Sequence, residues 1–530
     1  MEAVAALVAV ASLLAVFLLY PLYLSPAAAA RRLRNAGFSG PAPSFPLGNL
    51  REIASSLAVA NKPTTRSSAG GGSIHAAVFP YFARWRGAFG KVFVYWLGTE
   101  PFLYVADPEF LKAATAGALG KLWGKPDVFR RDRMPMFGRG LVMAEGDEWA
   151  RHRHIIAPAF SATNLNDMIG VMEETTARMV NEWGDMVAAG NDVIDVEKGV
   201  VRNAAEIIAK ASFGIDDGDA TGAMVFSKLQ EMQAMLFRST RLVGVPLAGL
   251  LQIRATYDAW KLGREIDALL LDIIATRRRQ QQQHRRGRST DLLALLLAGN
   301  EAHAGVERKL TSRELVDECK TFFFGGHETT ALALSWTLLM LAAHPDWQSA
   351  VRDEIFSVAG DESGHLDAAA LSNLPKTSCV LNEVLRLYPP SPNVQRQALH
   401  DVTINNDNKN KNSSSQSVII PKGTNMWIDV VAMHRDVELW GEDADLFRPE
   451  RFMKEAVQGG CRHRMGFVPF GFGGRICVGR NLTAMELRVV LAMVLRRFEL
   501  EVAPEYRHQP KIMLSLRPSH GIQLRLKPLK

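Results

Sequence analysis

The chain has 530 residues, of which 47% are hydrophobic and 22% are charged, and it carries a formal net charge of +7. This composition indicates a large globular protein and excludes a disordered chain. The charge excess fits a surface near anionic lipid or an acidic protein partner, and no nucleic acid is expected as a partner because no motif for binding it is present. The four cysteines are far apart and form no CxxC pair, which argues against a zinc site or a disulfide framework and favours a reducing compartment.

The first predicted element is an apolar helix. Residues 3–24 are almost wholly apolar and uncharged, and about 20 such residues suffice to cross a bilayer. Three arginines follow between positions 31 and 34, and a basic cluster of this kind stays on the cytoplasmic side. A cleaved signal peptide is the alternative, but Glu2 precedes the apolar run and the arginines follow it, which is the wrong order of charges. We therefore predict an uncleaved transmembrane anchor over residues 1–30, followed by a basic, proline-rich hinge over residues 31–50.

Strands are predicted near both ends of the remaining chain. Residues 92–96 and 102–105 are rich in β-branched and aromatic residues and flank a short turn. Residues 405–417 form a tract of Asn, Lys and Ser, predicted to be a long flexible hairpin tip. Near the C-terminus, residues 512–516 and 522–526 alternate around a Ser-His-Gly turn, so we predict that these two stretches pair with each other as a hairpin.

Helical patterns occupy the middle of the chain from Trp149 onward. Trp149 and Arg153 are four residues apart on one helix face, where an indole N–H and a guanidinium can both bind a carboxylate. The same spacing is common on solvated or half-buried faces, so by itself it leaves both interpretations open. Residues 165–213 and 224–241 continue the helical pattern, and their Met-rich apolar group suits either the core or a substrate wall.

The longest helix is predicted to begin after Thr311 and to end at His344, which precedes a proline. Thr311 and Glu314 have the spacing of a capping box. A helix of over 30 residues is roughly 50 Å long, which is enough to cross a whole domain.

The middle of this helix reads GGHETT over residues 325–330. Two glycines inside a helix each cost about 1 kcal/mol relative to alanine, so the close approach of a ligand is one expected compensation. Glu328 beside Thr329 places an acid next to a hydroxyl, a pair that can relay protons. Close helix packing with a solvent-facing Glu328 is the alternative.

The most informative stretch is the glycine-rich segment around Cys477. Glycine permits positive φ and a close approach of the backbone to a large flat group. A strongly helical run follows the cysteine, and a thiolate just before a helix is stabilised by backbone N–H groups and by the helix dipole; Arg475 adds a positive charge. The alternatives are a buried cysteine and a phosphate-binding loop, but the GxxxxGKS/T pattern is absent. We predict a deprotonated cysteine that binds a metal.

Residues 470–479 read FGFGGRICVG and resemble, at each specified position, the haem-binding signature FGxGxRxCxG of the cytochrome P450 superfamily. The anchor, the hinge and the motifs described above also stand in the family's order, and the chain resembles the plant microsomal type. The resemblance implies a mainly α protein with a small β lobe, the cytochrome P450 fold, with a single large catalytic domain over residues 51–530 after the N-terminal transmembrane helix.

The resemblance also implies roles for individual residues. Cys477 corresponds to the thiolate ligand of a haem b iron. Groups that hold the haem correspond to Trp149, Arg153, Arg396, Phe470, Arg475 and Gly479. Glu328 and Thr329 correspond to the acid and alcohol that deliver protons during catalysis. A buried structural triad corresponds to Glu383, Arg386 and Arg451. His327 stands at a variable position and receives no role.

The function implied is that of a monooxygenase. Such an enzyme inserts one oxygen atom from O2 into an apolar small molecule, here a fatty acid or an isoprenoid or hormone-type compound. The electrons come from NADPH through NADPH-cytochrome P450 reductase. The implied location is the endoplasmic reticulum membrane, crossed once and in contact with its lipid, with the catalytic domain in the cytosol. Residues 146–160 and 516–521 resemble the plant clan that modifies hormones and lipids.

Two other functions and one substrate question stay open at this point. A haem-thiolate isomerase or dehydratase of lipid hydroperoxides needs no proton relay, and such relatives tend to lack the threonine pair. A non-catalytic haem-binding membrane protein would leave that pair unexplained. The substrate walls are predicted at 126–140, 232–245, near Phe324 and at 514–516. Arginines in the first wall are expected to be exposed near the membrane, with contact to a substrate carboxylate as the alternative; these are Arg130, Arg131 and Arg133.

Overall fold

The structure is a computed structural model in which the description covers six single positions before residue 20 and the following ranges: 20–60, 73–214, 220–238, 242–248, 252–283, 291–302, 309–360, 364, 366–404 and 417–529. Most residues before position 20 of the predicted anchor, and the tip of the predicted hairpin, residues 405–416, lie outside the described residues. Within these ranges, no helix is both long enough and apolar enough to span a membrane.

Helices form most of the body, as the sequence predicts. Their bounds are α2 (Ser25–Asn35), α3 (Leu50–Ala60), α4 (Ile74–Val78), α5 (Pro80–Phe89), α6 (Pro108–Thr115), α7 (Asp127–Phe137), α8 (Gly146–Ile156), α9 (Ala162–Asn166), α10 (Ile169–Ala188), α11 (Val196–Phe213), α12 (Ala220–Arg238), α14 (Ile253–Gln283), α15 (Leu292–Ala302), α16 (Ser312–Ala343), α17 (Pro345–Ala359), α18 (Ala368–Ser372), α19 (Pro375–Leu387), α20 (Val430–His434), α21 (Val437–Trp440) and α22 (Arg480–Arg497). Short helical turns of other types occur at Tyr20–Leu24, Gly117–Leu122, Ala157–Phe160, Pro449–Phe452, Arg464–Gly466 and Gly473–Arg475.

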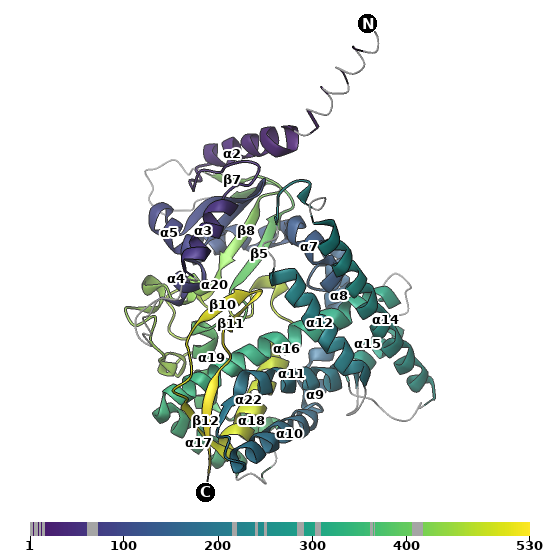
Figure 1. Ribbon diagram of the computed structural model, residues 1–530, viewed down its shortest axis with the longest axis vertical. Helices are drawn as coiled ribbons and strands as arrows, with labels where there is room; N and C mark the ends of the chain where they lie inside the picture. Colours follow the sequence, from purple (N-terminus) through teal and green to yellow (C-terminus); the bar gives the residue numbers. More distant parts are fainter. Residues whose placement is uncertain are drawn as a thin grey trace.

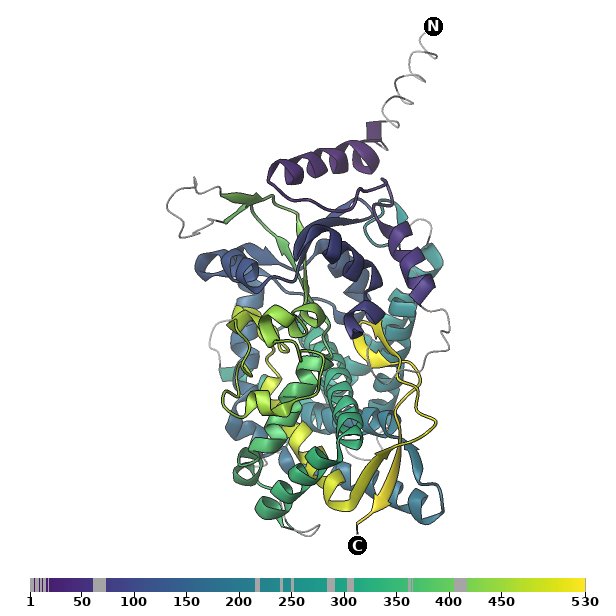
Figure 2. The same cartoon turned by 90° about the vertical axis from the view of Figure 1, so that its left-hand side faces the viewer.

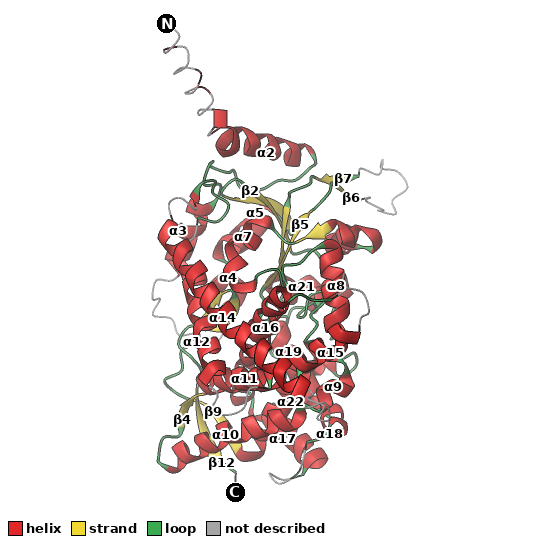
Figure 3. Ribbon diagram, turned by 90° about the vertical axis from the view of Figure 1, so that its right-hand side faces the viewer, coloured by secondary structure: helices red, strands yellow, loops and turns green. Residues whose placement is uncertain are grey.

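The strands form small sheets, of which the two largest lie at opposite ends of this helical body (Figure 3). Their bounds are β1 (Val92–Leu97), β2 (Glu100–Val105), β3 (Trp123–Gly124), β4 (Val193–Asp195), β5 (Asn393–Ala398), β6 (Val402–Ile404), β7 (Val418–Ile420), β8 (Asn425–Asp429), β9 (Phe498–Val502), β10 (Pro510–Met513), β11 (Ser515–Pro518) and β12 (Gln523–Pro528). The largest sheet has the order β1-β2-β8-β5-β3, and a second has the order β4-β12-β9. The pair β10 and β11 lies between these two sheets (Figure 1).

The five-stranded sheet confirms the strands predicted between residues 92 and 105. β1 and β2 are antiparallel, with Val92 opposite Val105 and Leu97 opposite Glu100. β8 then pairs in parallel with β2 and antiparallel with β5. The pair β6 and β7 lies at the same end of the molecule as this sheet and projects from it (Figure 2). The sheet therefore carries β5, which contains Arg396, toward the middle of the protein.

The prediction that residues 512–516 pair with residues 522–526 in a C-terminal hairpin is wrong. β10 pairs with β11 around Leu514, with Ile512 opposite Leu516, whereas β12 pairs with β9 and β4. Leu514 has a φ of 68°, a left-handed conformation that turns the chain inside the stretch read as one strand. No glycine, proline or asparagine marks this turn, so the alternation continues across it and conceals it from sequence reasoning.

Helix α16 passes through the middle of the body, where it packs against α11, α19 and α22 (Figure 1). Its predicted capping box is present: the Thr311 hydroxyl accepts from the Glu314 backbone N–H, and the Glu314 carboxylate accepts from the Thr311 backbone N–H at 2.7 Å. Residues on nearly all of its circumference are buried. A helix that is buried on all sides belongs to the core of a large protein, so α16 is a rigid wall for any site beside it.

Candidate active site

A cavity of about 430 Å³ lies beside α16, at the segment that contains Cys477. α7, α8, α16 and β5 contribute to its walls, together with the loop before α22 and the turn at Leu514. Eight of the predicted site residues line it, namely Trp149, Arg153, Thr329, Arg396, Phe470, Arg475, Cys477 and Gly479. The fold therefore brings together residues that are more than 300 positions apart in the sequence.

The loop before α22 presents the sulfur of Cys477 to this cavity. Gly471 and Gly473 adopt φ values of 74° and 65°, which other residues rarely adopt. The Cys477 backbone N–H donates to the Phe470 carbonyl at 2.9 Å and closes the loop. Burial raises the pKa of the Cys477 thiol, while backbone N–H groups at the start of α22 and the positive charge of Arg153 act in the opposite direction. A coordinated metal cation deprotonates a thiol outright, so this sulfur suits a metal.

Three arginines line the same cavity without a carboxylate partner. Arg153 donates to the Ile476 carbonyl at 3.0 Å, and Arg475 donates to the Ala144 carbonyl at 2.8 Å. Arg396 donates only to a neighbouring backbone carbonyl, that of residue 395, at 2.9 Å. Within the described ranges none of the three forms an ion pair.

Positive charge therefore accumulates at one edge of the cavity. Burial, and then the charge of Arg475, lower the pKa of Arg396 to about 10, and burial also lowers the pKa values of Arg153 and Arg475. Buried charges of one sign are costly unless a counter-charge binds beside them. The Arg475 guanidinium also lies 4.9 Å from the centre of the Trp149 ring, which holds its plane in place.

This set of donors fits a haem. The Cys477 sulfur would be a ligand for its iron, and the three arginines would supply the counter-charge for two propionate carboxylates, which an isolated metal ion would not need. Gly325 of α16 faces open space in the cavity, since a Cβ built on it has no atom within 4 Å. A flat group can therefore approach the helix backbone closely at this point.

The two glycines in the middle of α16 have different roles. Gly325 leaves room in the cavity, whereas a Cβ on Gly326 would lie 2.5 Å from a side-chain carbon of Ile208 on α11. The sequence left two explanations for these glycines open, the close approach of a ligand and close helix packing. The first fits Gly325 and the second fits Gly326. Thr329 lines the cavity, and its hydroxyl donates to the Gly325 carbonyl at 2.8 Å, the predicted bond to the residue four positions earlier.

Glu328 does not line the cavity as Thr329 does. Its Oε1 accepts from Gln233 Nε2 of α12 at 2.8 Å and lies 3.9 Å from Arg517 Nη1 of β11. Consecutive residues of a helix point about 100° apart because a turn takes 3.6 residues, and here the cavity adjoins Thr329 but not Glu328. The predicted acid and alcohol are adjacent in sequence, but the carboxylate is buried between α12 and β11.

The triad predicted from the resemblance is present and buried. Arg386 and Glu383 form two hydrogen bonds, of 2.7 and 2.8 Å, with both side chains inaccessible to solvent. Arg451 Nε lies 3.6 Å from the Glu383 carboxylate. Arg386 also donates to the backbone carbonyls of His434 and Ala444. The triad therefore ties α19 to the segment before the Cys477 loop.

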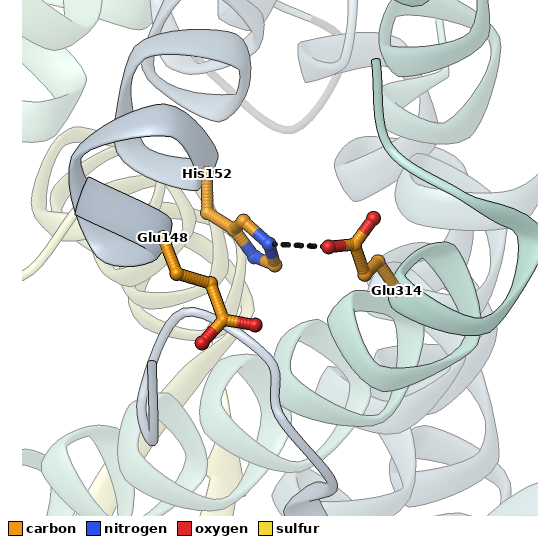
Figure 4. Close-up of side chains that lie close together, drawn as sticks. All are labelled: Glu148, His152 and Glu314. Atoms are coloured by element: carbon orange, nitrogen blue, oxygen red, sulfur yellow. Dashed lines mark hydrogen bonds and ion pairs between the residues drawn. The ribbon is translucent and has the colours of Figure 1, made fainter. Parts of the chain in front are cut away.

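His152 forms a second buried ion cluster, between α8 and α16. Glu148, His152 and Glu314 place possible metal-ligand atoms within 4.8 Å of one another (Figure 4). Both ring nitrogens of His152 already face carboxylates, with Nδ1 2.6 Å from Glu318 and Nε2 3.3 Å from Glu314. A protonated imidazole that donates from both nitrogens accounts for the two carboxylate contacts and leaves no lone pair for a metal. Arg151 Nη2, which also lies 3.2 Å from Nε2, then donates to Glu314 and not to the ring.

The charge state of this cluster predicts a pH dependence of stability. Although burial opposes protonation, the hydrogen bonds and charges of Glu318 and Glu314 raise the pKa of His152. A raised pKa stabilises the folded state below the ordinary histidine pKa of about 6.5, and this contribution is lost as the pH rises through the folded-state value. We expect His152→Gln to lower the free energy of unfolding at about pH 5.5 by about 1.5–3 kcal/mol, the range for charged hydrogen bonds, and by less at higher pH.

Urea unfolding at a series of pH values measures this effect, with exposed His520→Gln as the matched control. An equal loss of stability at all pH values would contradict a charged His152.

Comparison with known proteins decides the family. The cytochrome P450 family model matches residues 71–526. The chain belongs to the cytochrome P450 family. It is 34% identical over 511 residues to a cytokinin hydroxylase of Arabidopsis thaliana, across 96% of this chain and 94% of that protein. It is also 33% identical to cytochrome P450 714C2 of Oryza sativa subsp. japonica, across 95% and 94% of the two chains, and 34% identical to cytochrome P450 714C3 of the same organism, across 98% and 97%.

This P450 is therefore a plant-type monooxygenase, and membership of the family implies a haem b that is reduced by a redox partner. The resemblance drawn from the Cys477 loop is confirmed, as is the mainly helical fold with small sheets.

The predicted substrate walls of the P450 are only partly at the cavity. Five residues between 126 and 140 line it, as do Phe324 and Leu514. No described residue between 232 and 245 does so. The expectation of exposed arginines holds for Arg131 alone, since Arg130 forms ion pairs with Asp127 and Glu145 and Arg133 lines the cavity.

Sequence reasoning also missed two residues of the P450, one that lines the cavity and one that binds Glu328. Lys125 lines the cavity, and burial together with Arg396 and Arg475 holds its pKa well below the ordinary value. Gln233, which donates to Glu328, lies in the Met-rich stretch of α12. A single polar residue within this apolar stretch was the only sequence signal that could have indicated its role.

Proposed function

We propose that this P450 inserts one oxygen atom from O2 into a C–H or double bond of an apolar fatty acid, isoprenoid or hormone-type compound. One observation carries the proposal: Cys477, three arginines without ion pairs and Thr329 share one cavity. The name of the relative from Arabidopsis thaliana, cytokinin hydroxylase, supports a hormone-type substrate. We further propose that the electrons come from NADPH through NADPH-cytochrome P450 reductase.

Haem, when bound, supplies the activation of dioxygen that no side chain can perform. Cys477 would ligate its iron through the thiolate, and Arg153, Arg396 and Arg475, with Trp149, would hold its propionates. Phe470 and Gly479 would line the face beside Cys477. Apolar residues such as Phe137 and Phe324 exclude water from the substrate side, which strengthens the electrostatic interactions inside.

Thr329 is proposed to hold the proton that catalysis consumes. Its hydroxyl donates to the Gly325 carbonyl and can accept a second hydrogen bond from a water in the cavity. Rotation of the hydroxyl away from Gly325 would let it donate its proton into the cavity while it takes up a proton from that water. Glu328 is proposed to resupply this proton, and its bonds to Gln233 and Arg517 hold its carboxylate behind Thr329.

We also propose that residues 1–30 anchor the protein in the endoplasmic reticulum membrane by a single pass, with residues 31–50 as the hinge and the catalytic domain of residues 51–530 in the cytosol. The apolar and uncharged run at residues 3–24 supports this topology, as do the arginines that follow it. Membrane lipid would then also be the medium from which an apolar substrate enters.

Replacement of Thr329 by valine tests the proton-delivery role. We expect product formed per NADPH oxidised to fall by about tenfold or more, with hydrogen peroxide released instead, because valine keeps the shape and lacks the proton. The haem spectrum stays unchanged. The measurement is the ratio of product to NADPH consumed in the reductase-coupled system.

Thr337→Val is the matched control, because the Thr337 hydroxyl makes the same type of bond, to the Ala333 carbonyl at 2.7 Å, on the same helix and away from the cavity. Unchanged coupling in Thr329→Val would remove Thr329 from the proposal.

A further inference from the structure

The cationic side chains that line the cavity can be grouped by the anions that neutralise them. Arg130 is neutralised by Asp127 and Glu145. Under the proposed function, Arg153, Arg396 and Arg475 are neutralised by the propionates of haem. Lys125 and Arg133 line the same cavity and belong to neither group. Burial and the neighbouring arginines hold the pKa of Lys125 well below its ordinary value, whereas the pKa of Arg133 is lowered only to about 10, so Arg133 stays charged at neutral pH.

Arg133 is held in place by aromatic rings. Its guanidinium carbon lies 4.5 Å from the centre of the Phe129 ring, one turn earlier on α7, and 5.4 Å from the centre of the Phe237 ring on α12. Its Nε is buried without a hydrogen-bond partner, and Arg133 forms no ion pair with any described carboxylate. A guanidinium that stacks on rings keeps its N–H edge available, and that edge matches a carboxylate bidentately.

The charge of Arg133 is present at neutral pH and has no ion-pair partner among the described carboxylates. Burial lowers its pKa to about 10, with the neighbouring Asp132 acting in the opposite direction. A half-buried guanidinium without a paired anion is unfavourable, whereas Phe129 and Phe237 stabilise it only through their ring faces. A ligand that brings one carboxylate to this position therefore gains a charged hydrogen-bonded pair.

The surroundings of Arg133 indicate the rest of the ligand. Phe137, Leu141 and Phe324 are among the cavity residues, so a ligand body at this wall is apolar. We infer that Arg133 binds the carboxylate of the substrate and that the substrate is an apolar monocarboxylic acid. This inference rests on the proposed function, since it narrows the substrate class of the same cavity.

Binding of acids and of their esters tests this inference. The probes are lauric acid with methyl laurate and abietic acid with methyl abietate, each titrated into the haem-loaded full chain by calorimetry and by the optical spin-state shift. We expect at least one acid to bind about tenfold or more tightly than its ester, the range for a charged hydrogen bond. Arg133→Gln removes that preference and leaves ester binding unchanged, whereas Arg133→Lys retains part of it.

Arg130→Gln is the matched control, because the neighbouring guanidinium already has two carboxylate partners. The inference is overturned in favour of a structural role if Arg133→Gln weakens the binding of acid and ester equally. The same holds if this variant lowers the melting temperature without changing the preference for acid over ester. Binding of neither acid, or equal binding of acid and ester to the unchanged chain, overturns it as well. Calorimetry measures acid binding independently of the spin-state shift and of the product formed per NADPH oxidised. Failure of the proposed monooxygenase function can therefore be distinguished from failure of this inference.

Discussion

Replacement of Cys477 by serine is expected to abolish the thiolate-type absorption spectrum of the haem-loaded protein and its monooxygenase activity. A hydroxyl is a poor ligand for haem iron, and the thiolate is the ligand that favours cleavage of the O–O bond in this family. The measurement is the optical spectrum of the reduced, carbon-monoxide-bound protein, together with the haem content per chain.

The other cysteines are not expected to replace Cys477. Cys319, Cys379 and Cys461 are buried, and none of them lines the cavity. Burial keeps them in the thiol form, since it raises the pKa of Cys461 to about 11 and raises those of Cys319 and Cys379. Cys379→Ser therefore serves as the control and should retain the spectrum. A thiolate spectrum in folded Cys477→Ser would overturn the assignment of the ligand.

Replacement of Arg386 by alanine is expected to cause the largest loss of stability. It leaves Glu383, which is fully buried, without the guanidinium that makes two hydrogen bonds to it. The removal of one partner of a buried ion pair costs about 3–5 kcal/mol, because the remaining charge is uncompensated. Such a loss is a large part of the about 5–15 kcal/mol that stabilises a typical protein. The urea midpoint and the yield of folded, haem-loaded protein measure it.

Arg448→Ala is the control for this effect. Its side chain is 55% exposed and pairs with Asp443, while only its backbone N–H contacts Glu383. An exposed pair of this kind contributes about 0–1 kcal/mol. The double variant Glu383→Leu, Arg386→Leu should lose less stability than Arg386→Ala, since it leaves no buried carboxylate and Arg451 keeps Asp443 as its partner. Equal losses in Arg386→Ala and Arg448→Ala would contradict a buried triad.

Features that depend on neighbouring residues were predictable from the sequence. The capping box at Thr311, the proline stop after His344, the strands between 92 and 105 and the Cys477 loop all follow from interactions over a few positions. The family resemblance rests on the same short stretches, so the family could be identified without knowing how the chain packs. The turn at Leu514 is the exception, because nothing in its local sequence departs from a strand.

The tertiary structure decided what each side chain faces. The spacing of Glu383 and Arg386 is the same in an exposed pair as in a buried one, and only the packing of distant segments around α19 made it buried. Glu328 and Thr329 are neighbours, but α12 and β11 surround the first while the cavity adjoins the second. Sequence alone therefore determined the local structure and the family of this protein. The placement of charges, including Arg133, was decided by contacts between elements far apart in the chain.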